Sequence, residues 1–279
     1  MKAGPGGEEL PLFAHHTSSF LDLVEARQPD MLPWNRVDEN TADTTAIPHG
    51  TTVLAATFPG GVMVAGDRRA TAGNMIVNRE LEKVALADDY SIIAYAGAVS
   101  MSLELIRLFQ FELQHYEKVQ GRSLSTAGKA NRLAAMVRAN LGLAAQGMVA
   151  LPLYAGYDEA KGTGHIFSYD IGGGPYEERG FYALGSGSPY ARGAMKKLYR
   201  DDLTVDELAR ACVEALYDAA DDDAATGGPD LTRGIYPVLA VATADGARRY
   251  SDDEAAAIAR TVVDARMTSP LGPKAPLRP

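Results

Sequence analysis

The chain has 279 residues, 46% of them hydrophobic and 23% charged, an ordinary composition for a globular protein of one or two domains. Its formal net charge of -9 argues against a nucleic-acid-binding protein, and its single cysteine excludes an internal disulfide and a multi-cysteine zinc site. No apolar run approaches the ~18–20 residues of a membrane span, and the first residues lack the apolar core of a secretory signal. We therefore expect a cytoplasmic protein without membrane contact.

The first 50 residues differ in composition from the rest of the chain. They hold five of the 15 prolines and the only tryptophan, and they show no strand alternation. One short amphipathic helix is expected over 19–26, with Ser18 or Ser19 as its N-cap. Composition alone leaves two interpretations open, a dispensable tail and a propeptide.

Beyond this leader, β-branched and apolar runs alternate with helical patterns. Pro59-Gly60-Gly61 predicts a hairpin between the first two strands, and Gly121 and Gly147 predict the ends of the first two long helices. The expected elements are strands over 52–58, 62–66, 83–86 and 90–96, helices over 99–119 and 126–146, strands over 149–157, 165–170 and 180–184, helices over 189–199 and 205–220, a strand over 236–242 and a helix over 252–265.

This order predicts an α+β fold in four layers. The links between consecutive strands are short, which implies antiparallel sheets. Helix pairs inserted between the strand blocks can cover the outer faces of two stacked sheets, giving an α-β-β-α sandwich. We expect one domain over 51–267, preceded by the leader 1–50 and followed by a flexible proline-rich tail over 268–279. Cys212 lies on the apolar stripe of the helix over 205–220, which favours a buried core residue over a nucleophile.

Three polar residues stand where predicted strands begin or end. Thr51 starts the first strand, directly after Gly50. A hairpin turn centred near Gly60 pairs positions that sum to about 120, which places Thr51 opposite Arg69 and diagonal to Asp67. Lys83 enters a later strand. Each residue alone is ordinary for its place, and their spacing is compatible with convergence without establishing it.

Taken together, these segments resemble the β-type subunits of proteasomes, over roughly residues 51–267. The long leader is most similar to that of the actinobacterial form. The motifs that carry the resemblance are Gly50-Thr51-Thr52-Val53, Gly66-Asp67-Arg68-Arg69-Ala70, Glu82-Lys83-Val84, Tyr95-Ala96-Gly97, Gly185-Ser186-Gly187-Ser188 and Asp223-Ala224-Ala225-Thr226-Gly227-Gly228.

The resemblance implies an N-terminal-nucleophile hydrolase, a threonine endopeptidase with the four-layer fold inferred above. Its nucleophile would be Thr51, exposed when the chain cleaves itself after Gly50. The freed α-amine, with an ordinary pKa of ~7.7–8.0, would act as the base. Lys83 would lower the pKa of the Thr51 hydroxyl and amine, Asp67 would hold Lys83 charged and oriented, and Arg69 would support this cluster.

Further roles carry over in the same way. The backbone N–H of Gly97 would form the oxyanion hole, and the glycine would admit the substrate closely. Ser186, Asp223 and Thr226 would orient the new amine, with Thr226 at a position where the family often has serine. Thr71 and Val99 would also present backbone groups to an extended peptide, and the small or apolar lining implies cleavage after hydrophobic residues. The substrate-binding residues implied by ungapped correspondence are Ala70, Thr71, Leu81, Ala85, Tyr95 and Val99.

The resemblance also implies partners. Two stacked rings of seven such subunits would lie between two rings of proteasome α subunits, and a regulatory ATPase at the α rings would deliver unfolded polypeptides. No metal or organic cofactor is required, because the chain itself supplies nucleophile, base and oxyanion donors. We expect apolar leader residues to dock on the subunit, on its cavity side: Phe20, Leu21, Leu23, Val24 and Trp34.

Three alternatives stay open at this point. A non-catalytic ring subunit would have a structural role only, but such subunits lack the threonine, the lysine or the processing glycine. The simpler bacterial two-component protease lacks the long leader. An amidase of the same superfamily would act on non-peptide substrates.

Overall fold

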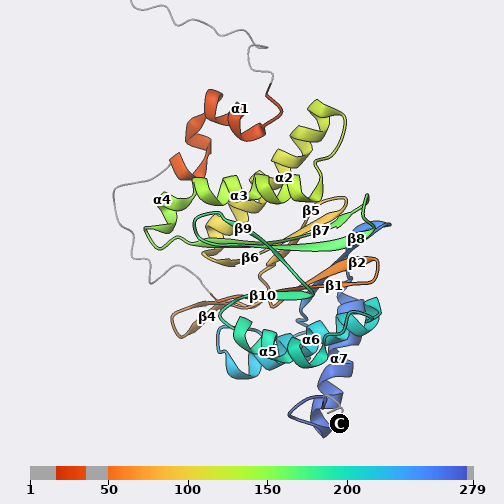
Figure 1. Ribbon diagram of the computed structural model, residues 1–279. Helices are drawn as coiled ribbons and strands as arrows, with labels where there is room; N and C mark the ends of the chain where they lie inside the picture. The colour runs from red at the N-terminus through yellow and green to blue at the C-terminus, as the bar shows by residue number, and fades with distance from the viewer. Residues whose placement is uncertain (1–16, 36–49, 275–279) are drawn as a thin grey trace, which may run out of the picture.

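Two five-stranded sheets lie face to face in the computed structural model, which describes residues 17–35 and 50–274 (Figure 1). The first sheet has the order β10-β1-β2-β11-β12, and each neighbouring pair is antiparallel. Its strands are β1 (Thr52–Phe58), β2 (Gly61–Gly66), β10 (Phe181–Gly185), β11 (Val238–Thr243) and β12 (Gly246–Arg249).

The second sheet has the order β5-β6-β7-β8-β9 and is also antiparallel throughout. A separate short hairpin, β3 (Ala70–Ala72) and β4 (Met75–Asn78), follows β2. The strands of the second sheet are β5 (Val84–Asp88), β6 (Ser91–Gly97), β7 (Ala150–Asp158), β8 (Thr163–Tyr169) and β9 (Pro175–Glu178).

Helices cover both outer faces, so the predicted α-β-β-α sandwich is confirmed (Figure 1). One apolar cluster joins the first sheet to α5, α6 and α7, and another joins the second sheet to α2 and α3. The helices of the sandwich are α2 (Val99–Gln120), α3 (Thr126–Ala139), α4 (Leu141–Ala144), α5 (Ser188–Leu198), α6 (Val205–Asp222) and α7 (Asp252–Thr268).

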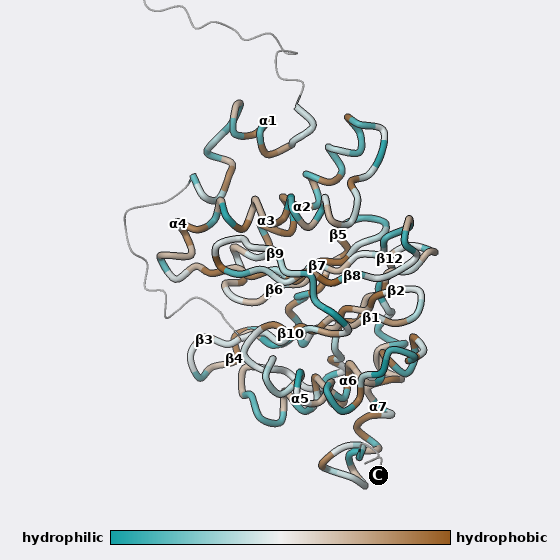
Figure 2. The backbone as a smooth tube through the Cα atoms, in the orientation of Figure 1, coloured by the Kyte–Doolittle hydropathy of each residue, from teal (hydrophilic) through white to brown (hydrophobic). Residues whose placement is uncertain are grey.

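Strand β1 shows why the inner strands of the two sheets are apolar on both faces. Val53 and Ala55 pack in the cluster between the sheets, whereas Leu54 and Ala56 pack against the helices. The period of two along a strand sends successive side chains to opposite faces, and here both faces are covered. Figure 2 accordingly shows much of the hydrophobic colouring along the strands and mostly hydrophilic loops.

Capping residues set several helix ends. The α2 helix ends at Gly121, whose φ of 66° is the left-handed conformation expected of a C-terminal glycine. Thr204 with Glu207 and Ser251 with Glu254 form capping boxes at the starts of α6 and α7. Cys212 is buried in α6, as predicted, and burial raises the pKa of its thiol to about 12.

The predicted elements differ from the structure at one helix and at four short strands. The helix predicted over 126–146 is interrupted at Asn140, whose side-chain amide donates to the Met136 carbonyl, and continues only as the short α4. Asparagine competes in this way with backbone hydrogen bonds. The strands β3, β4, β9 and β12 were not predicted, and each has only three or four residues.

The described part of the leader docks on the outer surface of α2, beyond the sandwich (Figure 1). Helix α1 (Phe20–Arg27) is capped by Ser19, and the turns η1 (Pro29–Met31) and η2 (Pro33–Asn35) follow it. The ring centroids of Phe20 and Phe111 lie 5.8 Å apart, with the rings tilted, and Leu21 packs against the apolar cluster that includes α2 and α3. The docking of apolar leader residues is thereby confirmed for this segment, while its cavity-side placement stays a prediction.

A buried carboxylate fixes the start of α1. Glu112 on α2 is only 1% exposed. It accepts a hydrogen bond from Leu21 N at 2.9 Å and forms an ion pair with Arg132, whose Nε lies 2.5 Å away. Leu21 lies in the first turn of α1, where backbone N–H groups lack partners within the helix. The carboxylate of Glu112 therefore gives one of these N–H groups a partner, and its negative charge stabilises the positive N-terminal end of the helix dipole. The leader residues 1–16 and 36–49 lie outside the described residues.

Candidate active site

The predicted site residues meet where β1 begins. The Thr51 carbonyl accepts from Ser186 N at 2.9 Å, directly after β10, and the Thr52 carbonyl accepts from Asp67 N at 3.0 Å, directly after β2. The start of β1 is thus held between its two neighbours in the sheet. Thr51 itself is 2% exposed.

Gly50 has a conformation that few other residues could adopt. Its φ is +92°, in the left-handed region. A Cβ atom built on it would lie 2.6 Å from Thr71 Oγ1 and 3.1 Å from the Ala225 carbonyl oxygen, so the surrounding loops leave no room for a side chain. The Thr51 hydroxyl donates to the Gly50 carbonyl oxygen at 2.6 Å. A hydroxyl group and a peptide carbonyl are therefore adjacent in a fixed geometry.

Lys83 reaches the same carbonyl from the second sheet. It lies just before β5, is 0% exposed, and its Nζ donates to the Gly50 carbonyl at 3.0 Å and to Asp67 Oδ1 at 2.6 Å. Its third donor goes to the Arg69 carbonyl, so all three ammonium protons are used. Burial lowers the pKa of Lys83, and the charge of Asp67 opposes that shift.

Asp67 accepts hydrogen bonds from backbone donors as well as from Lys83. Its Oδ1 accepts from Thr52 N at 2.8 Å, and its Oδ2 accepts from Arg69 N at 2.8 Å and from Gly227 N at 2.9 Å. These hydrogen bonds tie the end of β2 to β1 and to the loop that contains Gly227.

The predicted pairing of Thr51 with Arg69 is wrong by one residue. In the β1–β2 hairpin, Phe58 pairs with Gly61, so the turn consists of two residues and paired positions sum to 119. Continued past Val53 and Gly66, this register places Asp67 opposite Thr52, and Arg68 rather than Arg69 opposite Thr51. Convergence survives because the Asp67 carboxylate reaches Thr52 N and Lys83 together.

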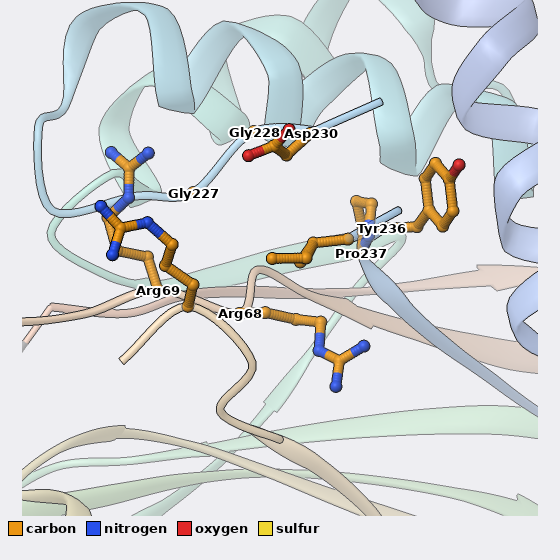
Figure 3. A pocket seen from close by; sticks show the side chains of 9 residues that line it. Arg68, Arg69, Gly227, Gly228, Asp230, Tyr236 and Pro237 are labelled. Carbon is orange, nitrogen blue, oxygen red and sulfur yellow. The ribbon is translucent and has the colours of Figure 1, made fainter. Parts of the chain in front are cut away.

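Arg69 supports this cluster through its backbone and its guanidinium. Its Nη1 donates to the Ala224 carbonyl at 3.0 Å. Figure 3 shows Arg69 beside the loop at Gly227 and Gly228, whereas the guanidinium of Arg68 points away from that loop. A small pocket of about 40 Å³ lies between them, next to the site.

A second polar group gathers around Asp223, at the end of α6. Ser186 Oγ and Thr226 Oγ1 each donate to Asp223 Oδ2 at 2.6 Å. Partial burial alone would raise the pKa of Asp223, but the hydrogen bonds from Ser186, Thr226 and Ala225 N outweigh it and hold the pKa below its usual value. Ser186 Oγ also lies 3.5 Å from the Thr51 carbonyl oxygen, so this group borders the start of β1.

Sequence reasoning missed one member of this group, Thr52. Its hydroxyl lies 2.6 Å from Thr226 Oγ1 and accepts from Gly187 N at 2.9 Å. A second hydroxyl residue directly after Thr51 was the available signal. Its partners follow β10 and α6, however, and no local pattern reveals them.

Gly97 ends β6, and the structure shows a reason for its lack of a side chain that was not expected. Its φ is +109°, and a Cβ atom there would lie 2.1 Å from the Val149 carbonyl oxygen. The glycine is therefore required by the close passage of Val149, whatever approaches from outside. The role of its N–H as an oxyanion donor stays a prediction.

The expected substrate-binding residues fall into two groups by exposure. Ala70 and Tyr95 are each 1% exposed, and Thr71 is also buried. The Tyr95 hydroxyl donates to the Glu82 carbonyl at 3.4 Å, and burial, followed by the charge of Asp67, raises its pKa to about 12. The three partly exposed members are Leu81, Ala85 and Val99.

The described residues offer neither a metal-binding cluster nor a membrane-spanning helix. Across 17–35 and 50–274, no cluster of three or more His, Cys, Asp or Glu side chains is arranged to hold a metal ion. In the same part of the chain, every helix is too short or too polar to cross a membrane.

Known proteins share this chain's sequence over nearly its whole length. A family model described as proteasome subunit matches residues 47–230. Proteasome subunit beta 2 of Thermomonospora curvata is 55% identical over 98% of both chains. Proteasome subunit beta of Streptosporangium roseum is 54% identical, covering 94% of this chain and 93% of the relative. The corresponding protein of Acidothermus cellulolyticus is 51% identical over 98% and 97%. These similarities confirm the family to which the motifs pointed.

Proposed function

This chain belongs to the proteasome subunit family, and on that premise we propose that it is the catalytic β subunit of a proteasome core particle. It acts as a threonine endopeptidase, with Thr51 as the nucleophile. One observation carries this proposal: the Gly50 carbonyl oxygen accepts hydrogen bonds from both the Thr51 hydroxyl, at 2.6 Å, and the buried Lys83 ammonium, at 3.0 Å. A purely structural subunit has no need of such an arrangement.

The first reaction is cleavage of the chain by itself. Thr51 Oγ1 forms a bond to the Gly50 carbonyl carbon, the Gly50–Thr51 C–N bond breaks, and the hydroxyl proton ends on the Thr51 nitrogen. Lys83 stabilises the negative charge that develops on the carbonyl oxygen during the attack, because its ammonium already points there. Water then hydrolyses the resulting ester, which leaves a carboxylate on Gly50 and a free α-amine on Thr51. Residues 1–50 are thereby removed as a propeptide.

The free amine makes repeated turnover possible. An unactivated hydroxyl is a poor nucleophile and needs a nearby base. Before cleavage the Thr51 nitrogen belongs to an amide, which is too weakly basic to serve as the general base, so the precursor does not turn over substrates. Afterwards the amine takes the Thr51 hydroxyl proton as Oγ1 attacks a substrate carbonyl, and it returns the proton to the leaving amine. Water hydrolyses the acyl-enzyme ester and regenerates Thr51.

The surrounding residues have supporting roles. Lys83 lowers the pKa of the Thr51 hydroxyl and amine by its charge, and the carboxylate of Asp67 keeps it oriented. Ser186, Thr226 and Asp223 orient the amine from the side of α6. Gly97 N–H serves as the oxyanion donor.

Substrates are polypeptides bound as an added strand. Thr71 and Val99 pair with the peptide backbone, and the apolar residues near them favour cleavage after hydrophobic side chains. The residues that border the first specificity pocket are Ala70, Leu81, Ala85, Tyr95 and Val99.

The subunit works within a larger particle. Two rings of seven copies stack between rings of α subunits, and a regulatory ATPase at the α rings supplies unfolded chains in the cytoplasm. Enclosure explains why latency matters, because an active Thr51 before ring closure would have unrestricted access to cellular proteins.

The test compares Thr51→Ala with wild type after co-expression with an α-type subunit. Thr51→Ala should retain residues 1–50 and hydrolyse no peptide, whereas Thr261→Ala, which removes an exposed hydroxyl on α7, should behave as wild type. Processing or peptide hydrolysis by Thr51→Ala would contradict the proposal. A wild-type particle that does neither would favour the structural ring subunit.

A further inference from the structure

The hydroxyl of Thr52 has no role in the chemistry described above, yet it is completely buried beside the nucleophile. Thr52 shares its face of β1 with Leu54 and Ala56, which pack against the helices. Thr51 therefore points to the opposite face, between the sheets. Thr52 can act on Thr51 only through other residues.

The hydrogen bonds around Thr52 have a fixed direction. Asp223 accepts at 2.6 Å from Thr226 Oγ1, so the single hydroxyl proton of Thr226 is committed to that carboxylate. In the 2.6 Å contact between the two threonine hydroxyls, Thr226 must then accept and Thr52 must donate. Gly187 N–H fits this direction, because it donates to the Thr52 oxygen at 2.9 Å. The chain of donors runs from Gly187 N through Thr52 and Thr226 to Asp223.

The packing around these hydroxyls is independent support for a built arrangement. A Cβ atom on Gly187 would lie 2.5 Å from both Thr52 Oγ1 and Thr226 Oγ1. Only a residue without a side chain lets the two hydroxyls meet beneath the first turn of α5. Thr226 is itself 0% exposed, so water does not compete for its oxygen from that side.

We propose that Thr52 is a positioning residue for the α-amine of Thr51. By donating to Thr226, its hydroxyl occupies one lone pair of the Thr226 oxygen and keeps the Thr226 proton on Asp223. The other lone pair of Thr226 stays directed toward the new amine, next to Ser186, which donates to the same Asp223 oxygen. The inference rests on the proposed function, because the amine exists only after cleavage.

This role separates the two reactions of the site. Peptide hydrolysis uses the α-amine as base and depends on the Thr226 oxygen that orients it. Self-cleavage takes place before the amine exists. It depends instead on the Gly50 carbonyl, Lys83 and Asp67. Of these groups, Thr52 contacts Asp67, through its backbone N–H and not through its hydroxyl. Loss of the Thr52 hydroxyl should therefore slow hydrolysis far more than self-cleavage.

The experiment compares Thr52→Val, which keeps the side-chain shape but removes the hydroxyl, with Thr52→Ser, which keeps the hydroxyl. Particles co-expressed with an α-type subunit are assayed on a fluorogenic peptide, and self-cleavage is timed by intact mass. Thr52→Val should lower kcat about tenfold with KM within about twofold, the size expected for one hydrogen bond in the transition state. Thr52→Ser should recover kcat to within about threefold, and both should cleave themselves within about threefold of the wild-type rate.

A matched control lies on the same strand. Thr57 hydrogen-bonds through its hydroxyl to the Gly180 carbonyl and Tyr199, away from the site, so Thr57→Val should leave hydrolysis unchanged. If Thr52→Val fails to assemble, Thr52→Ala removes the same hydroxyl without added bulk and carries the comparison.

Two results would overturn the inference. Wild-type kcat in Thr52→Val would show that the hydroxyl does not position the amine. Equal slowing of hydrolysis and self-cleavage, without recovery in Thr52→Ser, would show a general structural role. A wild-type particle without Thr51-dependent hydrolysis would instead overturn the proposed function, and this inference with it.

Discussion

Replacing Gly50 by alanine should strongly slow self-cleavage while the chain still folds. Gly50 has a φ of +92°, where an L-residue costs about 1–2 kcal/mol. Its new Cβ atom would lie 2.6 Å from Thr71 Oγ1 and 3.0 Å from Ala225 Cβ. Reaching the 3.4 Å of ordinary van der Waals contact requires a displacement of about 0.8 Å.

That displacement acts on the reacting carbonyl. The Gly50 oxygen would move relative to Thr51 Oγ1 and Lys83 Nζ, which now lie 2.6 and 3.0 Å away. Misplacement by about 1 Å costs about a hundredfold in rate. We therefore expect Gly50→Ala to cleave itself about a hundredfold more slowly than wild type, in a time course by intact mass during assembly with an α-type subunit.

Gly60 provides a matched control in the β1–β2 turn. Its φ is +88°, but a Cβ atom there would meet no atom within 4 Å. Gly60→Ala should lose about the same 1–2 kcal/mol of stability and still cleave itself at the wild-type rate. A wild-type rate in Gly50→Ala would refute the reasoning. Equal slowing in Gly60→Ala would assign the effect to lost stability rather than to the position of the carbonyl.

Three further predictions concern the charged groups. Lys83→Ala should abolish self-cleavage and peptide hydrolysis, while sedimentation should still show an assembled particle. Lys83→Arg should not restore either activity, because arginine differs from lysine in donor geometry. Near-normal activity of the arginine variant would show that only a positive charge is needed at this position. The lowered pKa of Asp223 contributes stability that is present above its unfolded value of ~3.9 and is lost as the pH falls through the lower folded value. The difference in unfolding free energy between wild type and Asp223→Asn, measured in urea, should therefore shrink as the pH falls below ~4, and a constant difference would contradict this assignment. Glu112→Gln should loosen the docked leader, seen as faster hydrogen exchange over residues 17–35, whereas Glu117→Gln on the exposed side of α2 should not; equal exchange in all three proteins would leave Glu112 without a part in docking.

The sequence predicted the layers well because their signals are local. Apolar alternation indicated β1 and β2, and Gly121 indicated the end of α2. The interruption at Asn140 was missed because the helical pattern continues past it, and only the side-chain hydrogen bond to Met136 reveals the break. The short hairpin β3–β4 has too few residues to show a period.

The candidate site was predictable from the family motifs, but its contacts were not. A one-residue error in the assumed turn centre placed Arg69 opposite Thr51, and only the two-residue turn corrects it. The link from Thr52 to Thr226 joins positions 174 residues apart, so it depends on how the sheet and α6 pack. The reason given for a glycine at position 97 was incomplete, since the Val149 carbonyl, directly before β7, also requires one there.

The most direct test of the account is the N-terminal residue of the chain in an active particle. Intact mass and N-terminal sequencing after co-expression with an α-type subunit should show a chain that begins at Thr51 with a free α-amine. Blocking that amine by acetylation should then stop peptide hydrolysis. An active particle whose chain still begins at Met1, or whose first residue is not Thr51, would contradict the account.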